Sequence, residues 1–325
     1  MNAGSLSVIM ANYNHAHYIG EALQAILSQS LRPKEIIIVD DASTDDSVAV
    51  IEQFVKRDPI IHFIRNDQNR GPLFSHNRAL DIASSDYVYF PAADDRVLPG
   101  LFEKSMNILA QYPQAGLCCS DPASFTDHVD VISENRLYLN DRPCYFSPAE
   151  LVGLMRWKHA AVAGHTSVIK RSALLQAGNW IQELKWHCDW FALLVIGFRY
   201  GICYIPEPLA TIRVLPHSYS SSGIRQWPAQ REVLDHLLRL LKSPAYRDVL
   251  PLFKRSNALA APSKMGVVLL SNPKHWDYLS LPIIQRSLWP ELRLRLARIS
   301  PSPVKLVYRC IRDIRRRTLR GSRSL

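Results

Sequence analysis

Two adjacent aspartates, Asp94 and Asp95, stand where an apolar run ends in the stretch FPAADDRVLP, residues 90–99. Carboxylates about 4 Å apart repel each other by about 1 kcal/mol in water and by roughly 4 kcal/mol at an effective dielectric constant of 20. Either water screens such a pair or a cation binds it. Taken alone, the pair fits a solvated turn and a metal site equally well, so the rest of the chain has to decide between them.

Polar residues also follow two earlier apolar runs. Tyr13 lies in the sequence NYN after SLSVIMA, residues 5–11, and Asp41 follows EIIIVD, residues 35–40. Both runs are short and rich in β-branched residues, which is typical of buried strands. Ligands of parallel sheets bind beyond the carboxyl ends of the strands. Separate strand ends would therefore deliver acids to one crevice.

The elements that must position these residues alternate along the chain. Further strands are predicted over residues 60–65 and 87–91. Helices are predicted over residues 19–27, from the DASTDDS segment to about Lys56, and from the turn at residues 69–72 to about Ala83, with Thr44 or Asp45 able to cap the second. This alternation indicates an α/β fold with a mostly parallel central sheet and right-handed crossovers.

Two common nucleotide motifs are absent from the sequence. No GxGxxG follows the first strand, which argues against a dinucleotide cofactor, and no GxxxxGK[ST] is present, which excludes a P-loop enzyme. An acidic crevice binds phosphate poorly unless a metal reverses its sign. Mg²⁺ and Mn²⁺ take carboxylate ligands and bridge to phosphates. The residues therefore favour a metal-assisted site for a nucleotide diphosphate.

Charge is distributed unevenly over the 325 residues. From residue 226 onward there are 20 Lys or Arg against 6 Asp or Glu, while the first 225 residues carry a net charge of −4. In residues 301–325, apolar and basic side chains recur on separate faces at helical spacing, which is typical of a helix lying on an anionic membrane surface. A solvated tail, or a helix packed on the catalytic domain, is the alternative. Nucleic acid is not expected as a partner, since no aromatic residues interleave with the arginines.

Six cysteines show no CxxC pair and no zinc spacing, so we expect reduced thiols and a cytoplasmic protein. The N-terminus has no basic stretch before its first strand, so a secretory signal is not expected. The most apolar segment, residues 190–205, is interrupted by Arg199 and is too short to span a bilayer.

The motifs SVIMANYN, IIIVDDASTDDS, NRGPLFSHN and YVYFPAADDRVLP, in this order, resemble those of family 2 glycosyltransferases with a GT-A fold. The resemblance continues through HTSVIKRSALLQAGNW, HCDWFALLV and IPEPLATIRVLPHSYS and covers roughly residues 5–222. It implies a GT-A domain over residues 1–225, with a nucleotide-binding half up to about residue 120 and an acceptor half after it. Residues 226–325 would form a helical, basic extension.

The resemblance implies several nucleotide contacts. Tyr13 corresponds to the family tyrosine that packs on the nucleobase, and Asp41 to the aspartate that accepts a hydrogen bond from the base. Asp40 is then structural. His76, which replaces an arginine common in the family, and Asn77 are further expected contacts of the nucleotide.

The reacting groups follow from the same resemblance. Asp95 corresponds to the last acid of the DXD-type motif, which binds a divalent cation, Mn²⁺ or Mg²⁺, and Asp94 would contact the ribose or the metal. Asp189 in HCDW corresponds to the catalytic base; taken alone, it could simply favour the positive end of a helix dipole. Arg213 and His217 correspond to the arginine and histidine that bind the pyrophosphate and the metal.

This chain departs from the family pattern at two further points. Ala92 occupies a position where a further aspartate is common, which we interpret as a changed ribose contact. The spacing from Arg213 to His217 is two residues longer than the usual R-x-H. Near the expected base, His165 and His187 are predicted to be packing or acceptor contacts.

The implied reaction is an inverting, metal-dependent transfer of one sugar from a nucleotide diphosphate sugar, with UDP-sugar the expected donor, to a hydroxyl of a glycan or lipid-linked acceptor. Cell-surface polysaccharide synthesis and a peripheral position on the inner face of the cell membrane are the expected setting. The absence of QxxRW argues against a processive synthase. Two alternatives remain: a sugar-phosphate nucleotidyltransferase, whose glycine-rich N-terminal loop is missing here, and a non-catalytic membrane-surface module.

Overall fold

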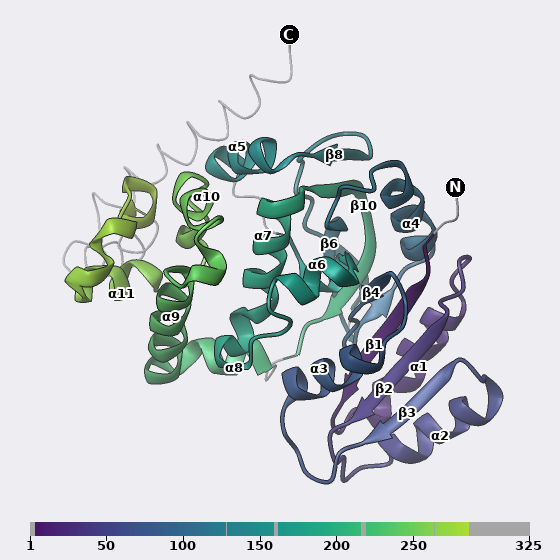
Figure 1. Cartoon of the computed structure of the whole chain (residues 1–325). Helices are drawn as coiled ribbons and strands as arrows, with labels where there is room; N and C mark the ends of the chain where they lie inside the picture. The colour runs from purple at the N-terminus through teal and green to yellow at the C-terminus, as the bar shows by residue number, and fades with distance from the viewer. Residues whose placement is uncertain (1–3, 128, 159–161, 216–218, 263, 286–325) are drawn as a thin grey trace. The chain divides into compact units, whose positions relative to one another are not determined.

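The computed structural model describes residues 4–127, 129–158, 162–215, 219–262 and 264–285 (Figure 1). The chain divides into two compact units, Met1–Ala258 and Leu259–Leu325. The whole sheet lies in the first unit. The boundary expected after residue 225 was drawn from the resemblance alone and stays a prediction.

The first unit opens with alternating strands and helices: β1 (Leu6–Asn12), α1 (Ala16–Leu27), β2 (Glu35–Asp40), α2 (Ser47–Arg57), β3 (Ile61–Arg65), α3 (Pro72–Ile82) and β4 (Tyr87–Tyr89). The chain continues through β5 (Arg96–Val97), α4 (Leu101–Gln111), β6 (Leu117–Thr126), β7 (Val129–Glu134), β8 (Cys144–Phe146), α5 (Pro148–Lys158), η1 (Gly164–Thr166), β9 (Val168–Lys170), α6 (Arg171–Gln176), η2 (Gln182–His187), α7 (Cys188–Tyr200) and β10 (Ile202–Arg213). The elements after β10 are α8 (Tyr219–Arg225), α9 (Trp227–Leu241), η3 (Pro244–Tyr246), α10 (Leu250–Arg255), η4 (Ala258–Ala260), α11 (Met265–Ser271) and η5 (Pro273–Tyr278).

One mixed sheet forms the centre of the first unit, with the strand order β3-β2-β1-β4-β9-β6-β10-β5. The pairs β2–β3, β1–β2, β1–β4 and β6–β10 are parallel, whereas β9 runs antiparallel to β4 and β6. The strands and helices predicted up to residue 91 are confirmed, as is the α/β class with a mostly parallel central sheet. All described elements after β10 are helical, as expected for the C-terminal part.

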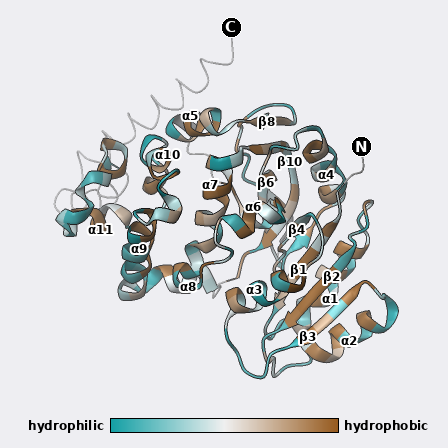
Figure 2. Cartoon of the chain, in the orientation of Figure 1, coloured by the Kyte–Doolittle hydropathy of each residue, from teal (hydrophilic) through white to brown (hydrophobic). Residues whose placement is uncertain are grey.

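Both faces of the sheet are covered, which explains the continuous apolar runs of its strands. Leu6, Val8 and Met10 point into one cluster with apolar residues of α1, α2 and α4. The intervening Ile9 is also fully buried, and α3 contacts β1 and β2. Figure 2 shows the middle of β2 coloured as hydrophobic. A strand buried on both faces reads as an unbroken apolar run rather than an alternating one.

The start of α2 differs from the expectation. Its N-cap is Asp46, without a side-chain capping bond, rather than Thr44 or Asp45. Asp45 instead accepts hydrogen bonds from the backbone N–H groups of Ser47, at 3.0 Å, and Ala16, at 2.9 Å. Its carboxylate thus links the starts of α1 and α2.

Among the described residues, no helix is long and apolar enough to cross a membrane. The apolar segment 190–205 folds as most of α7 and the first residues of β10. The five cysteines within the described ranges are free thiols. The sixth, at position 310, lies outside them.

Candidate active site

The carboxyl ends of β1, β2, β4 and β10 lie at one edge of the sheet. Because β9 is antiparallel to both β4 and β6, and β10 is parallel to β6, all four strands run in the same direction. Tyr13, Asp41 and the pair Asp94–Asp95 come just after three of these ends, and Arg213 is the last residue of β10. The predicted strand-end residues are therefore brought to a single edge.

Asp40 organises the loop after β2. Its Oδ2 accepts hydrogen bonds from Asn12 Nδ2 at 2.8 Å and from Ser43 Oγ at 2.5 Å, and its Oδ1 accepts one from the Ser43 backbone at 2.9 Å. Ala42 has a φ of 61°, in the left-handed region that costs a non-glycine residue roughly 1–2 kcal/mol. The hydrogen bonds of Asp40 offset this strain, in agreement with the structural role expected for it.

Asp41 is almost fully buried and already has protein partners. Its Oδ1 accepts from Asn66 Nδ2 at 2.6 Å and from the Arg70 backbone at 3.0 Å, and its Oδ2 accepts from the Gly71 backbone at 2.7 Å. The carboxylate therefore fixes the turn that leads into α3. A contact with a nucleobase stays a prediction, and it would use the remaining acceptor position.

Tyr13 is the exposed member of the NYN loop, with 43% of its surface accessible. The next residue, Asn14, has a φ of 56°, and its Oδ1 accepts a hydrogen bond from the Thr44 backbone at 2.8 Å. The loops after β1 and β2 are thus tied together, while the Tyr13 ring remains available for stacking on a planar ligand.

The acid pair lies in the loop between β4 and β5 and is attached to the end of β10. Asp95 Oδ1 accepts a hydrogen bond from the Arg213 backbone at 3.0 Å, and the Asp94 carbonyl accepts one from Arg213 Nε at 2.9 Å. Burial, together with the neighbouring charge of Asp94, raises the pKa of Asp95 to about 7, although the Arg213 backbone and charge act in the opposite direction.

The carboxylate oxygens of this loop fit a hard divalent cation whose remaining ligands come from a bound substrate. Within the described ranges, no hydrogen bond reaches the Asp94 carboxylate or Asp95 Oδ2. No group of three or more His, Cys, Asp or Glu side chains with metal-site geometry is found among those residues. Mg²⁺ commonly uses one or two carboxylates and completes its shell with substrate phosphates and water. Two carboxylates with free oxygens match that pattern.

The Arg213 side chain is buried among protein groups, with 3% of its surface accessible. Besides its bond to Asp94, its guanidinium pairs with Asp127 and with Glu21, the latter at 2.9 Å. It lies over the rings of Tyr18 and Phe125, at 4.3 and 4.5 Å from their centroids. The pyrophosphate contact expected for Arg213 stays a prediction. Such a contact would have to compete with these ion pairs.

Asp189 lies in the first turn of α7, as predicted from HCDW. Its Oδ1 accepts a hydrogen bond from the Trp190 backbone at 2.7 Å. Burial raises the pKa of Asp189, while backbone hydrogen bonds lower it. A carboxylate with a raised pKa at a helix start is a stronger base than an ordinary aspartate, which suits a group that must accept a proton.

A short chain of contacts leads from the end of β4 to Asp189. The Tyr89 hydroxyl donates to the His165 carbonyl at 2.8 Å, and the charge of Asp95 acts on Tyr89, whose pKa is raised mainly by burial. Gly164, next to His165, lies so close to Asp189 that a Cβ on it would be 2.9 Å from Asp189 Oδ2. The turn η1 therefore connects the surroundings of the two acids.

Burial lowers the pKa of both histidines near Asp189, and their role as packing or acceptor contacts stays a prediction. Burial lowers the pKa of His165 to about 4, and its Nε2 is buried with no partner among the described residues. His187 Nε2 lies 3.2 Å from Gln230 Oε1, which also accepts a hydrogen bond from Trp186 Nε1 at 2.6 Å. Gln230 belongs to α9, so a helix beyond the resembling region contacts the segment just before Asp189.

The two expected nucleotide contacts on α3 face protein groups. Asn77 Nδ2 donates to the Trp180 carbonyl at 2.8 Å, and Asn77 Oδ1 accepts from the Trp180 backbone at 3.1 Å. His76 packs edge-on against Phe90 at 5.3 Å, and burial lowers its pKa to about 4. His76 is therefore neutral at physiological pH. Contacts of either residue with a nucleotide remain predictions.

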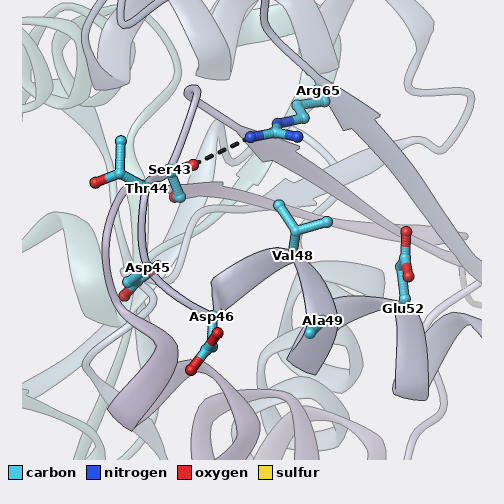
Figure 3. Close-up of a pocket in the computed structure, with 8 residues that line it drawn as sticks. All are labelled: Ser43, Thr44, Asp45, Asp46, Val48, Ala49, Glu52 and Arg65. Atoms are coloured by element: carbon cyan, nitrogen blue, oxygen red, sulfur yellow. Dashed lines mark hydrogen bonds between the residues drawn. The ribbon is translucent and has the colours of Figure 1, made fainter.

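His217 lies outside the described residues, so its metal-binding role stays a prediction. A hollow of 610 Å³, shown in Figure 3, lies at the start of α2 and is lined by residues 43–46, Val48, Ala49, Glu52 and Arg65. Arg65 donates there to the Ser43 carbonyl at 3.1 Å. None of the predicted site residues lines this hollow.

The structure adds groups that no sequence motif had singled out. Glu21, Asp127 and Tyr89 contact site residues from elements far along the chain, and Gly164 lies against the expected base. Only Tyr89 had a local signal, since it ends the strand that precedes the acid pair.

Comparison with known proteins agrees with this geometry. The model of the family described as Glycosyl transferase family 2 matches residues 7–176. A Bacillus subtilis (strain 168) relative, TuaG, whose name proposes a glycosyltransferase of teichuronic acid biosynthesis, is 29% identical over 230 residues, which cover 70% of this chain and 84% of the relative. A Haemophilus influenzae relative named as an uncharacterized glycosyltransferase is 32% identical, but the match covers only 34% of this chain and 44% of the relative.

Two solved structures share the fold at low sequence identity. S. aureus TarS, solved in complex with UDP-GlcNAc, has a TM-score of 0.59 and 16% identity, covering 87% of this chain and 81% of that chain. The mannosyltransferase PcManGT from Pyrobaculum calidifontis, solved with GDP-Man and Mn²⁺, has a TM-score of 0.57 and 18% identity, covering 93% and 82%. The family match covers more than half of the residues, so the chain belongs to glycosyl transferase family 2 and is a glycosyltransferase.

Proposed function

We propose that the chain transfers one sugar from a nucleotide diphosphate sugar to a hydroxyl group with inversion at the anomeric carbon. The observation that carries the proposal is the acid pair at the carboxyl edge of the sheet, with the Asp94 carboxylate and Asp95 Oδ2 free of described hydrogen bonds. The complexes of TarS with UDP-GlcNAc and of PcManGT with GDP-Man and Mn²⁺ support a nucleotide-sugar donor.

In this proposal Tyr13 stacks on the nucleobase and Asp41 accepts a hydrogen bond from it. Asp94 and Asp95 would hold Mn²⁺ or Mg²⁺, which would neutralise charge on the departing diphosphate. Asp189 removes the proton from the acceptor hydroxyl, and the resulting oxygen attacks the anomeric carbon opposite the leaving group. A single displacement of this kind inverts the anomeric configuration.

The acceptor is proposed to be a glycan or a lipid-linked sugar of a cell-surface polysaccharide. Two names support this class: that of TuaG, and that of the Campylobacter jejuni GalNAc(5)-diNAcBac-PP-undecaprenol β-1,3-glucosyltransferase, which is 34% identical over 102 residues. The basic residues after position 293, which lie outside the described ranges, would bring the enzyme to the anionic membrane surface where such acceptors are found.

A donor panel tests the proposal. UDP-, GDP- and dTDP-sugars are incubated with the chain and Mn²⁺ or Mg²⁺, and free nucleoside diphosphate is measured. We expect release from at least one sugar donor, fastest with a UDP-sugar. A nucleotidyltransferase would release no nucleoside diphosphate, and neither would a non-catalytic membrane module, so the absence of release from every donor would refute the proposal.

A further inference from the structure

Among the described residues, the Arg213 guanidinium has three polar partners. Its Nε donates to the Asp94 carbonyl at 2.9 Å, and its two terminal nitrogens pair with Asp127 and Glu21. The rings of Tyr18 and Phe125 lie against it. A planar cation that is stacked on rings and bonded along its edge has little freedom to reorient toward a ligand.

The same residue holds the acid pair at two points. Its backbone N–H donates to Asp95 Oδ1, and its side chain donates to the carbonyl of Asp94. The first contact leaves Asp95 Oδ2 as the oxygen free to bind a cation. The position of the acid pair relative to β10 therefore depends directly on Arg213.

Glu21 connects this arrangement to α1. It pairs with Arg213 and also with Arg96, the residue directly after Asp95. The Arg96 guanidinium lies over the Phe125 ring, 4.1 Å from its centroid. Glu21 thus bridges two arginines: Arg96, which follows the acid pair in sequence, and Arg213, which contacts it through hydrogen bonds.

We infer that Arg213 and Glu21 act as a clamp that positions Asp95 for a divalent cation, and that Arg213 is a positioning residue rather than a ligand of the pyrophosphate. The inference rests on the proposed function, because it takes Asp95 as the metal-binding acid. Charge supports it: Glu21 and Asp127 balance the charges of Arg213 and Arg96, so the group has no net positive charge with which to attract a diphosphate. Moving the guanidinium to a phosphate would also break its contacts with Asp94, Asp127 and Glu21.

The two roles predict different behaviour for Glu21. A clamp fails when either partner is removed, whereas a pyrophosphate ligand acts without Glu21. The test is therefore Glu21→Ala, with Arg213→Lys as the second variant. Glu207→Ala is the control, because the Glu207 side chain is equally exposed, at 46% against 45% for Glu21, and its ion pair is with Lys104, away from the arginines that Glu21 contacts.

Two affinities are measured for each full-length variant: that for Mn²⁺ alone, by the loss of the free-ion EPR signal, and that for UDP in EDTA. Loss of a group that orients a metal ligand typically costs about 10–100-fold in metal affinity. We expect a loss of this order for Mn²⁺ in Glu21→Ala and Arg213→Lys, with UDP affinity in EDTA within twofold of the parent. Nucleotide release should recover at high Mn²⁺, and Glu207→Ala should match the parent throughout.

The inference is overturned if Glu21→Ala binds Mn²⁺ like the parent, or if Arg213→Lys loses UDP affinity in EDTA while keeping its Mn²⁺ affinity. If Arg213→Lys does not fold, judged by its melting curve, Glu21→Ala alone decides. Failure of the proposed function is distinguishable, because the parent chain itself would then release no nucleoside diphosphate from any sugar donor.

Discussion

Two aspartates at the candidate site have raised pKa values for different reasons. Burial and the adjacent charge of Asp94 raise the pKa of Asp95. Burial alone raises the pKa of Asp189, while backbone hydrogen bonds at the start of α7 lower it. A metal would keep Asp95 ionised by direct charge. Asp189 has no such partner among the described residues, so its protonation should govern the rate.

We expect kcat to fall as the pH is lowered, with a midpoint above the ordinary aspartate value of 3.8. The direction follows because a raised pKa means that the carboxylate is protonated, and lost as a base, at a higher pH than usual. The measurement is kcat against pH at saturating donor and metal. Asp189→Asn should lose about 10²–10⁴-fold in kcat and also lose the acid limb, with donor binding nearly unchanged. An Asn variant that turns over at the parental rate would mean that another group is the base.

At the residue scale, position in the fold was predictable where the signal was local. Asp41 and Asp95 follow strands as expected because polar residues mark the ends of apolar runs, whereas the helix start at Asp189 was implied by the family resemblance. The partners of these acids were not predictable, since the Arg213 backbone and Asp95 are 118 residues apart and meet only through the order of strands in the sheet. The contact of Asn77 with Trp180 was not predictable either, and nor was that of Arg213 with Glu21, because neither motif indicates its distant partner.

At the scale of elements, the alternating pattern up to residue 91 was sufficient to predict β1 to β4 and their parallel pairing. The short strands β5 and β9 were not predicted. β9 pairs with β4 and β6 through three residues or fewer, and such short contacts carry no periodicity. They nevertheless decide the geometry of the site, because β9 joins the strands β1 to β4 with β6 and β10 and so brings Arg213 to the edge where Asp95 lies.

Gly164 in the turn η1 allows a test of whether this turn positions Asp189, the proposed base. Gly164→Ala should lower kcat by about 10–100-fold, because the new Cβ would press on Asp189 Oδ2 and displace the carboxylate, and misplacement by about 1 Å can cost 10²-fold. The melting temperature should change little, since the atom displaced is the end of a flexible side chain.

Gly153→Ala in α5 is the matched control. A Cβ there would meet no atom within 4 Å, and alanine favours the helix interior by up to about 1 kcal/mol. We expect parental kcat and equal or higher stability for the control. If Gly164→Ala kept the parental kcat, the close approach of η1 to Asp189 would have no part in catalysis.

At the scale of the whole molecule, the net charge lies almost entirely in the second unit. From Leu259 onward there are 14 Lys or Arg against 3 Asp or Glu, so the first unit is nearly neutral. The acids of the candidate site therefore belong to a unit that does not itself attract anionic surfaces. The amphipathic segment that prompted the membrane proposal, residues 301–325, lies outside the described residues.

We expect the full chain to sediment with vesicles that contain anionic lipid at low salt, and a chain ending at Ser300 to sediment less. Each basic residue near an anionic surface adds about 1 kcal/mol, and salt screens this attraction. Neutral vesicles are the control. Equal sedimentation of the two chains, or binding that ignores lipid charge and salt, would contradict the proposal.

The most direct test of the central claim is metal-dependent release of nucleoside diphosphate from the best sugar donor. We predict that EDTA stops release, that added Mn²⁺ restores it, and that Asp95→Ala abolishes it while retaining the parental melting temperature. Asp81→Ala, which removes an exposed acid on α3, should behave like the parent. Full release in EDTA, or an Asp95→Ala variant that remains as active as Asp81→Ala, would contradict the assignment of the acid pair as the metal-binding centre of this glycosyltransferase.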